Sequence, residues 1–210
     1  MFADRNDAAE RLAASLVQYK GQNPLILGIP RGAVPMAAVI ADRLEGEADV
    51  VLVRKLRAPG RPEFAIGAVE ESGWSYLNPD AGMAGANQDY VAREKAEQLE
   101  TLRERRARYT AQRAPIDPAG RIVIVVDDGL ATGSTMIAAL HAVRARNPER
   151  LICAVPVAPP ETVEHVRASC DELVCLDSPV PFYAVGQFYR DFRQVSDDEV
   201  VALLSSRNSG

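Results

Sequence analysis

The stretch 122–135 constrains the fold of this chain more than any other segment. It begins with five β-branched apolar residues, continues with the carboxylates Asp127 and Asp128, and then passes through a Thr-Gly-Ser-Thr sequence at 132–135. An apolar run without polar alternation, bounded by Gly120 and an acidic pair, is typical of a strand buried on both faces of a parallel sheet. The sequence therefore predicts an α/β fold with a ligand site at the carboxyl end of this strand.

A helix is expected directly after this turn, because residues 136–146 are good helix formers with apolar positions on one face. The hydroxyls at 132–135 can cap that helix, whose free amides would face a phosphate-sized space. Carboxylates repel phosphate, so Asp127 and Asp128 are expected to accept hydrogen bonds from sugar hydroxyls or to hold a divalent cation through its waters. A sugar phosphate satisfies both halves of the motif. The alternative is an acidic pair that only caps the helix.

Composition narrows the class of protein. The chain has 210 residues, of which 47% are hydrophobic and 25% charged, so we expect a single domain over 1–210 with one good core. No apolar run has the length of a membrane span, and residues 1–10 are not signal-like, which predicts a cytoplasmic protein without a membrane partner. The net charge of -5 argues against general nucleic-acid binding. Three cysteines without metal-ligand spacing are expected to be reduced.

Strands and helices are expected to alternate along the chain, which implies a parallel sheet with right-handed crossovers. Two short strands at 64–69 and 74–77 are expected to pair antiparallel. The charged helix 90–113 is expected to be a solvated connector with one packed stripe, and a homodimer contact through it is the alternative. The other expected strands are 24–29, 49–54, 122–126, 150–155 and 172–176, and the other expected helices are 8–20, 33–44, 136–146, 161–169 and 197–205.

Two further segments have residue types suited to anions. After the first expected strand, Gly32 allows close backbone approach and Arg31 supplies a planar charged fork, although Pro and Gly here also suit a plain turn. The segment 53–63 places four cations within eight residues, among Pro and Gly, and these would repel one another unless an anion or solvent screened them. It contains Lys55, one of only three lysines. A basic solvent-exposed turn is the alternative for this segment.

Aromatic side chains gather near the C-terminus. Five of the twelve aromatic residues lie within 182–192, around Pro179, Pro181 and Gly186. This arrangement is more typical of a wall or lid than of a regular strand or helix. Packing of a C-terminal tail onto the sheet is the alternative.

Residues 123–135 resemble the phosphoribosyl pyrophosphate (PRPP) signature of the type I phosphoribosyltransferases. That signature has four apolar residues, two acids, two apolar residues, and then small and hydroxyl positions around a glycine; Gly129 departs from it, because an apolar residue is usual there. The segment 30–32 resembles the family's pyrophosphate loop, and 53–63 resembles its mobile loop that closes over PRPP. The resemblance implies a central parallel sheet flanked by helices, with a small hood at about 176–195 that covers the acceptor.

The resemblance also implies an activity: transfer of the 5-phosphoribosyl group from PRPP to a nitrogenous base, with release of pyrophosphate and Mg²⁺ as the cofactor. Asp127 and Asp128 would hold the ribose hydroxyls, and Mg²⁺ through water or PRPP. Arg31, Gly32 and Lys55 would face pyrophosphate, so the implied catalytic residues are Arg31, Lys55, Asp127 and Asp128. The implied 5′-phosphate site consists of Ala131, Thr132, Gly133, Ser134 and Thr135. The candidates for acceptor contact are Asp177 and Tyr183.

Ala131 limits the acceptor. In the hypoxanthine-guanine enzymes the matching residue is an aspartate near the purine, and the segment 155–160 also lacks the lysine that those enzymes use. A 6-oxopurine is therefore not expected. Alanine is more like the adenine enzymes, but their other acceptor residues are not recognisable. The chain looks most like the stand-alone bacterial members of undefined acceptor, which have Pro-Arg-Gly, Val-Arg-Lys and Phe-Tyr-Ala-Val-Gly segments.

Other functions compete with this one. A PRPP- or nucleotide-sensing regulator without turnover stays open, because no acceptor signature is present. A phospho-acceptor receiver domain is disfavoured, since its chemistry needs a lysine at a later strand end and no lysine follows Lys95. Classical dinucleotide and Walker phosphate loops are excluded because neither glycine pattern occurs.

Overall fold

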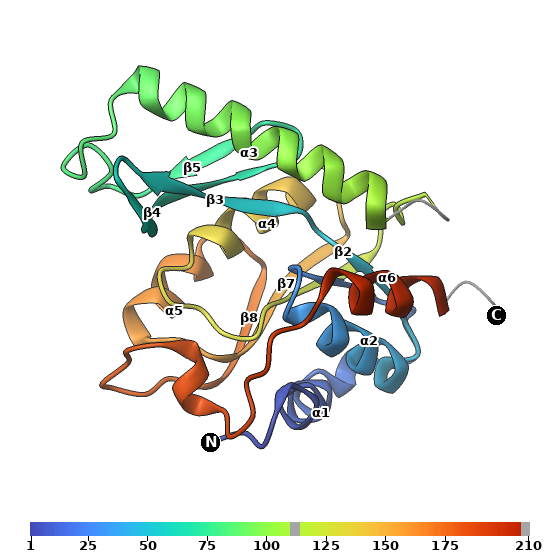
Figure 1. The fold of residues 1–210 in the computed structure, drawn as a ribbon. Coiled ribbons are helices and arrows are strands. Elements are labelled where there is room, and N and C mark those ends of the chain that lie inside the picture. The colour runs from blue at the N-terminus through green and yellow to red at the C-terminus, as the bar shows by residue number, and fades with distance from the viewer. Residues whose placement is uncertain (110–113, 207–210) are drawn as a thin grey trace.

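The computed structural model describes residues 1–109 and 114–206, which form a large parallel sheet flanked by helices and a smaller sheet beside it (Figure 1). The predicted α/β class with a central parallel sheet is confirmed. The main sheet has the order β2-β1-β6-β7-β8, with all its strands parallel. Its strands are β1 (Leu25–Gly28), β2 (Glu47–Val50), β6 (Ile122–Val126), β7 (Arg150–Val157) and β8 (Glu172–Asp177). The helices are α1 (Arg5–Ser15), α2 (Ala33–Leu44), α3 (Gln88–Tyr109), α4 (Ser134–Arg144), α5 (Pro160–Arg167) and α6 (Asp197–Ser206).

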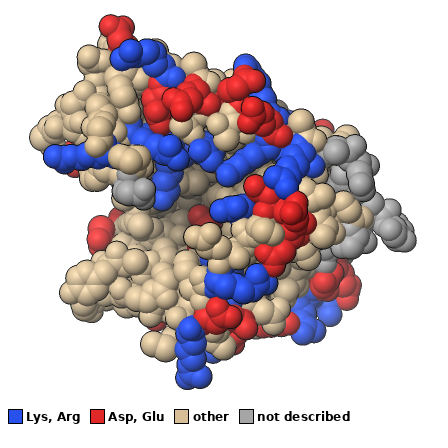
Figure 2. All heavy atoms as spheres, in the orientation of Figure 1, with Lys and Arg blue, Asp and Glu red and all other residues tan. Residues whose placement is uncertain are grey.

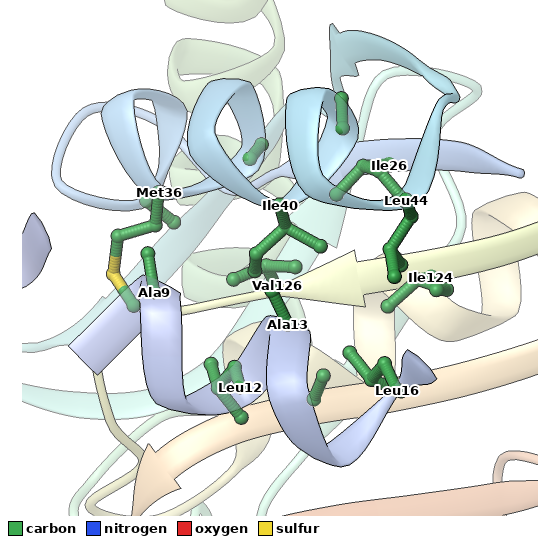
Figure 3. Packing of buried hydrophobic residues seen from close by; sticks show 14 of the residues in the cluster. Ala9, Leu12, Ala13, Leu16, Ile26, Met36, Ile40, Leu44, Ile124 and Val126 are labelled. Atoms are coloured by element: carbon green, nitrogen blue, oxygen red, sulfur yellow. The ribbon is translucent and has the colours of Figure 1, made fainter. Parts of the chain in front are cut away.

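The strand β6 is buried along its whole length, as its apolar sequence predicted. Ile124 and Val126 pack with α1 and α2 on one face of the sheet, where Figure 3 shows Ile40 beside Val126. Val123 and Val125 point to the other face and pack with α4 and α5. Side chains alternate across a strand, so a strand with helices on both sides needs apolar residues at every position.

The smaller sheet consists of β3 (Val53–Ala58), β4 (Arg61–Glu70) and β5 (Ser75–Leu77), all antiparallel. The predicted pairing of 64–69 with 74–77 is confirmed. The helix α3 lies along this sheet (Figure 1), and its buried residues are Glu94, Gln98, Leu102 and Tyr109. A single packed stripe was predicted, but two of its four buried residues are polar. The last four residues of the predicted helix 90–113 lie outside the described residues.

Two expectations for the segment 49–63 were wrong. The predicted strand 49–54 is divided between β2, which ends at Val50, and β3, which begins at Val53 in the other sheet. The basic segment is also not a loop, because it pairs with β4 in a hairpin that sets Lys55 opposite Ala68. Pro59 and Gly60 form the turn of that hairpin, and Pro62 already lies in β4. The local run of cations gives no sign that this segment pairs with β4.

The aromatic segment 182–192 partly packs as a tail onto the body of the protein and partly forms a wall of the site, so both alternatives considered for it apply. Its backbone pairs with the N-terminus, since Phe2 N–H donates to the Phe188 carbonyl at 2.7 Å. The buried Tyr189 ring packs beside Phe2, with 5.4 Å between ring centroids. Tyr183, in contrast, is 83% exposed. Most of these rings therefore pack a tail onto the body of the protein, and only part of the segment forms a wall of the site.

Among the helices described, none combines the length and the apolar character that crossing a bilayer requires. All three cysteines are free thiols, and burial raises the pKa of each, Cys153 most strongly. Their expected reduced state is compatible with this arrangement, in which Cys153 is part of the core.

Candidate active site

A cavity of about 380 Å³ opens at the carboxyl end of the main sheet, between β1 and β6. The chain leaves β1 toward β2 on one side and later returns to β6 on the other side, so the strand order reverses here. Loops that diverge from such a switch point leave a crevice in which α/β proteins bind ligands. Every residue that the sequence assigned to PRPP lines this cavity: Arg31, Gly32, Lys55, Asp127, Asp128, Ala131, Thr132, Gly133, Ser134 and Thr135.

The loop after β6 provides a cradle for an anion. It ends at Gly133, with φ 77°, and α4 starts at the next residue, so the first amides of the helix have no intrahelical partners. The loop is tied to α5, because the Thr162 hydroxyl donates to the Ala131 carbonyl at 2.6 Å. The Ser134 hydroxyl donates to Asn78 Oδ1 at 2.6 Å. Ser134 therefore offers an anion its amide, while its hydroxyl links the cradle to the segment after β5.

Replacing Gly133 by Ala is expected to lower the free energy of unfolding by about 1–3 kcal/mol, because the positive φ is strained for alanine and the site is close-packed. The added Cβ would lie 2.7 Å from Val166 Cγ2. Thermal unfolding measures the change. Gly120→Ala is the matched control, since Gly120 has φ 66° and no atom within 4 Å of a Cβ. Equal losses in both variants would show that the contact with Val166 contributes nothing.

Arg5 holds one oxygen of the acidic pair. Its Nε and Nη2 both donate to Asp128 Oδ2, at 2.9 and 2.7 Å, and its Nη1 donates to the Arg193 carbonyl at 2.6 Å. The guanidinium lies 3.9 Å from the centre of the Phe192 ring. Tyr189 hydroxyl donates to the Asp128 carbonyl at 2.6 Å. Because Arg5 donates only to Oδ2, the other carboxylate oxygen of Asp128 stays available to a ligand.

Sequence reasoning missed Arg5, which is 123 residues away from its partner. One local signal could have found it. A cation in the first turn of a helix lies at the positive end of the helix dipole, which disfavours it unless a carboxylate compensates. Arg5 is the first residue of α1, and its side chain is only 13% exposed. An arginine that is both buried and placed at the positive end of a helix dipole needs an acidic partner from elsewhere in the chain.

Burial raises the pKa of both acids. For Asp127 the pKa lies well above its usual range, first because of burial and then because of the charge of Asp128. For Asp128 burial again raises the pKa, and the Arg5 guanidinium opposes that rise. The Asp128 amide donates to Asp127 Oδ1 at 2.9 Å. Ligand hydroxyls or a cation would favour the ionised forms of both groups.

The residues present fit a Mg²⁺ that is shared with a phosphate ligand. The part of the chain that the structure describes has no group of three His, Cys, Asp or Glu side chains able to hold a metal. Protein carboxylates alone would therefore not complete a coordination shell at Asp127 and Asp128. Mg²⁺ usually takes one or two carboxylates and completes its shell with waters and substrate phosphates, which is what two adjacent acids beside an anion cradle allow.

Two glycines of the site have no room for a side chain. A Cβ on Gly32 would lie 2.2 Å from Asp128 Oδ2, so the ion pair of Arg5 and Asp128 lies in contact with this residue. A Cβ on Gly129 would lie 2.6 Å from Val185 Cγ1, and its φ is 154°. The departure from the PRPP signature at position 129 thus has a physical reason: the C-terminal segment packs against that backbone.

Two cations face the cavity without a close carboxylate partner among the described residues. Arg31 is 38% exposed, and its nearest carboxylate is Asp197, at 4.0 Å. Lys55 is exposed and has no ion pair with the residues that the structure describes. A bound anion would give each a closer partner than the protein does.

The two predicted acceptor residues lie apart from this cavity. Asp177 ends the edge strand β8 and lines a different hollow together with Met1 and Phe2. Tyr183 extends into solvent. Their role as acceptor contacts stays a prediction. Apolar side chains that line the cavity include Leu130 and Val185, which the sequence did not single out, and Phe192 of the C-terminal aromatic cluster.

Known proteins resemble this chain over nearly its whole length. The family model described as a phosphoribosyl transferase domain matches residues 3–193. The protein named "Putative phosphoribosyl transferase Rv0571c", from Mycobacterium tuberculosis, is 44% identical over 206 residues, which are 97% of this chain and 46% of that protein. This chain thus spans about half the length of that curated relative. The crystal structure of TT1426 from Thermus thermophilus is 48% identical, with a TM-score of 0.82 over 98% of both chains.

Proposed function

The chain belongs to the phosphoribosyltransferase family, and from this premise we propose that it transfers the 5-phosphoribosyl group of PRPP to a nitrogenous base, releasing pyrophosphate. One observation supports this activity more than any other. A single cavity at the switch point of the sheet holds an acidic pair, an anion cradle at a helix N-terminus and two cations that lack close partners. A sugar that carries phosphate at one end and pyrophosphate at the other matches that order of groups.

Each segment then has a separate task. Asp127 and Asp128 accept hydrogen bonds from the ribose hydroxyls, and the loop 131–135 binds the 5′-phosphate through the free amides at the start of α4. Arg31 and Lys55 neutralise the pyrophosphate as it leaves, at the moment when its charge increases. Positioning also contributes to the rate, because PRPP and the base are already held in place and need no further ordering to reach the transition state.

The residues that would hold Mg²⁺ are Asp127 and Asp128, together with the oxygens of PRPP. When bound, the ion supplies charge neutralisation on the leaving pyrophosphate. The chain's own residues orient it: Arg5 fixes Asp128 Oδ2, and the Asp128 amide fixes Asp127 Oδ1. The remaining carboxylate oxygens stay available to the ligand.

The acceptor would enter beside Ala131, between Leu130 and Val185. These side chains have no proton acceptor and no charge, so they select a flat apolar ring and do not distinguish its exocyclic groups. Main-chain groups would provide polar contacts. The base therefore stays undefined, and a PRPP-sensing regulator with the same donor site is the second candidate. We further propose a cytoplasmic location and a possible homodimer, with no nucleic-acid partner.

Pyrophosphate release tests the activity. The protein, PRPP and Mg²⁺ are incubated with a panel of purine, pyrimidine and other nitrogenous bases, and PRPP binding is measured separately by calorimetry. We expect release with at least one base and none without protein. PRPP at 100 times its Kd should also stabilise the fold by about 2.7 kcal/mol. Tight PRPP binding without release for any base would contradict the enzyme and leave the sensor. An absence of PRPP binding would contradict both.

A further inference from the structure

A row of alternate residues attaches the small sheet to the body of the protein. Trp74, Tyr76 and Asn78 alternate along β5 and its flanks, so their side chains point to the same face. Trp74 stacks on His141 of α4, with 3.5 Å between ring centroids and 7° between ring planes. The Tyr76 hydroxyl lies 2.8 Å from His165 Nε2 of α5. These three residues form the β5 seam, which joins the small sheet to the helices beneath it (Figure 1).

Asn78 connects the β5 seam to the anion cradle through the hydroxyl of Ser134. This hydroxyl donates to Asn78 Oδ1 at 2.6 Å, and Asn78 Nδ2 donates to the Ala65 carbonyl at 3.1 Å. The backbone N–H of Asn78 donates to the Ile66 carbonyl at 2.8 Å. Both carbonyls belong to β4. The orientation of the side-chain amide follows from these partners, because its NH₂ group must face a carbonyl and its oxygen then faces Ser134.

The single proton of the Ser134 hydroxyl is used outside the cradle. A hydroxyl donates only one hydrogen bond, and Asn78 accepts the one from Ser134. Thr132 Oγ1 lies 3.1 Å from Ser134 Oγ and must be the donor of that pair, because the Ser134 proton already has an acceptor. An anion in the cradle meets the free amides of α4 directly. It can take the Ser134 proton only by breaking the hydrogen bond to Asn78.

This exchange of partners favours an anion over a neutral ligand. Ser134 is buried, with 2% of its surface exposed, so its hydroxyl needs an acceptor at all times. A phosphate oxygen accepts a stronger hydrogen bond than a neutral amide oxygen does, because it is charged. Asn78 is half-buried, and its released oxygen can accept from water. Loss of the bond therefore leaves no buried polar group without a partner.

The small sheet that the seam holds presents cations to the cavity. Lys55 lies on β3, which pairs with β4, and Asn78 is bonded to β4. Figure 2 shows Lys and Arg side chains gathered along the border of the hollow, on the side formed by the small sheet and α3. The way in which the sheet docks on α4 therefore sets how closely these cations approach a ligand.

We propose that Asn78 is a positioning residue whose hydrogen bond from Ser134 acts as a latch, which an anion in the cradle releases by taking the Ser134 proton. The inference rests on the proposed binding of the 5′-phosphate at 131–135. Release separates the end of β5 from the N-terminus of α4, so the small sheet adjusts its position once the phosphate is bound. The latch makes phosphate binding weaker than the cradle alone would allow, and it couples this binding to the small sheet.

Calorimetric titration with ribose 5-phosphate tests the latch without an acceptor base. Asn78→Ala removes the latch and should bind ribose 5-phosphate about fivefold more tightly than the wild type, which corresponds to the ~1 kcal/mol net contribution of one hydrogen bond. Asn78→Leu keeps the side-chain volume without the amide and should give the same result. Tyr76→Phe is the matched control: it removes a hydrogen bond of the same seam, to His165, and should stay within about twofold of the wild type.

Trp74 provides a second readout, because it is the only tryptophan of the chain and lies in the β5 seam. Ribose 5-phosphate should change its fluorescence in the wild type, and Asn78→Ala should show part of this change before any ligand is added. In a Ser134→Ala background the hydroxyl is removed, so adding Asn78→Ala should change the affinity by no more than about twofold. Thermal unfolding shows that each variant is folded at the assay temperature.

Unchanged or weaker ribose 5-phosphate binding in both Asn78 variants, with binding intact in the wild type, would overturn the latch and leave the proposed function standing. Equal tightening in Tyr76→Phe would also overturn it, since a loosened seam would then explain the effect. So would a Trp74 fluorescence that ribose 5-phosphate leaves unchanged in the wild type. An absence of ribose 5-phosphate binding in the wild type and in every variant would contradict the proposed function, and the latch with it.

Discussion

An Asp127→Asn variant is expected to lose about 10²-fold in the rate of PRPP-dependent pyrophosphate release and yet to unfold at a higher temperature than the wild type at about pH 8. The loss of rate has a direct cause. A carboxylate accepts stronger hydrogen bonds from sugar hydroxyls than an amide does, because the acceptor is charged. The amide of the variant would also present an N–H donor to the ligand in place of one acceptor oxygen.

The gain in stability follows from the raised pKa of Asp127. A carboxyl whose pKa is higher in the folded than in the unfolded state binds its proton more tightly when folded. Its contribution to stability is therefore fully present below the unfolded pKa and is lost as the pH rises through the folded pKa. Above that range the wild type holds a buried charge next to Asp128, and asparagine does not. Its Oδ1 can still accept from the Asp128 amide.

Thermal unfolding at about pH 8 and about pH 4 measures this difference. We expect an increase in Tm of at least about 2 °C at the higher pH, since 1 kcal/mol shifts Tm by about 2–4 °C in a protein of this size. The difference should shrink toward zero at the lower pH. Asp7→Asn is the control with the opposite sign, because hydrogen bonds from the Ala3 amide and Arg11 lower the pKa of Asp7. A lower Tm for Asp127→Asn at the higher pH would contradict the buried-charge explanation.

The acidic pair and the anion cradle of the candidate site could be predicted from sequence because each part of them is local. A strand, an acidic pair, a small-residue turn and a helix follow one another within 122–135, and their order along the chain is their order in space. The same is true of the loop at 30–32. Neighbouring parallel strands bring both loops to one edge of the sheet, so the predicted residues line one cavity even where the elements around them differ from the prediction.

The errors come from contacts between distant residues. The cations at 54–57 suggested a loop because nothing local shows that β4 pairs with them. Asp177 is the last residue of β8, which lies at the edge of the sheet, two strands from the switch point, so Asp177 lies apart from the cavity and its acceptor role stays a prediction. Strand order is a property of the whole chain, and periodicity does not reveal it. Arg5 was missed for a related reason, since its partner is fixed only when the N-terminus pairs with residues 188–191.

Gly32→Ala tests whether the position of Asp128 limits the rate. The new Cβ would lie 2.2 Å from Asp128 Oδ2 and 3.0 Å from Arg5 Nε, so the carboxylate must move, and the guanidinium with it. A displacement of roughly 1 Å in a catalytic group can cost about 10²-fold. We expect this loss in kcat/KM for pyrophosphate release. The backbone of Gly32 is compatible with alanine, so the effect comes from the displaced pair and not from strain in φ.

Gly82→Ala is the matched control, because a Cβ at Gly82 meets no atom within 4 Å, and we expect wild-type kinetics and Tm from it. The Gly32→Ala variant should lose about 1–3 kcal/mol of stability, as overpacked sites do, and should still be folded at assay temperature. Ribose 5-phosphate binding separates the two halves of the donor site. The cradle at 131–135 is untouched, so the 5′-phosphate is still held while the contact with the ribose hydroxyls weakens. If kcat/KM stays within threefold of the wild type although the protein is destabilised, the carboxylate of Asp128 has moved without consequence, and Arg5 then only helps to hold the fold together.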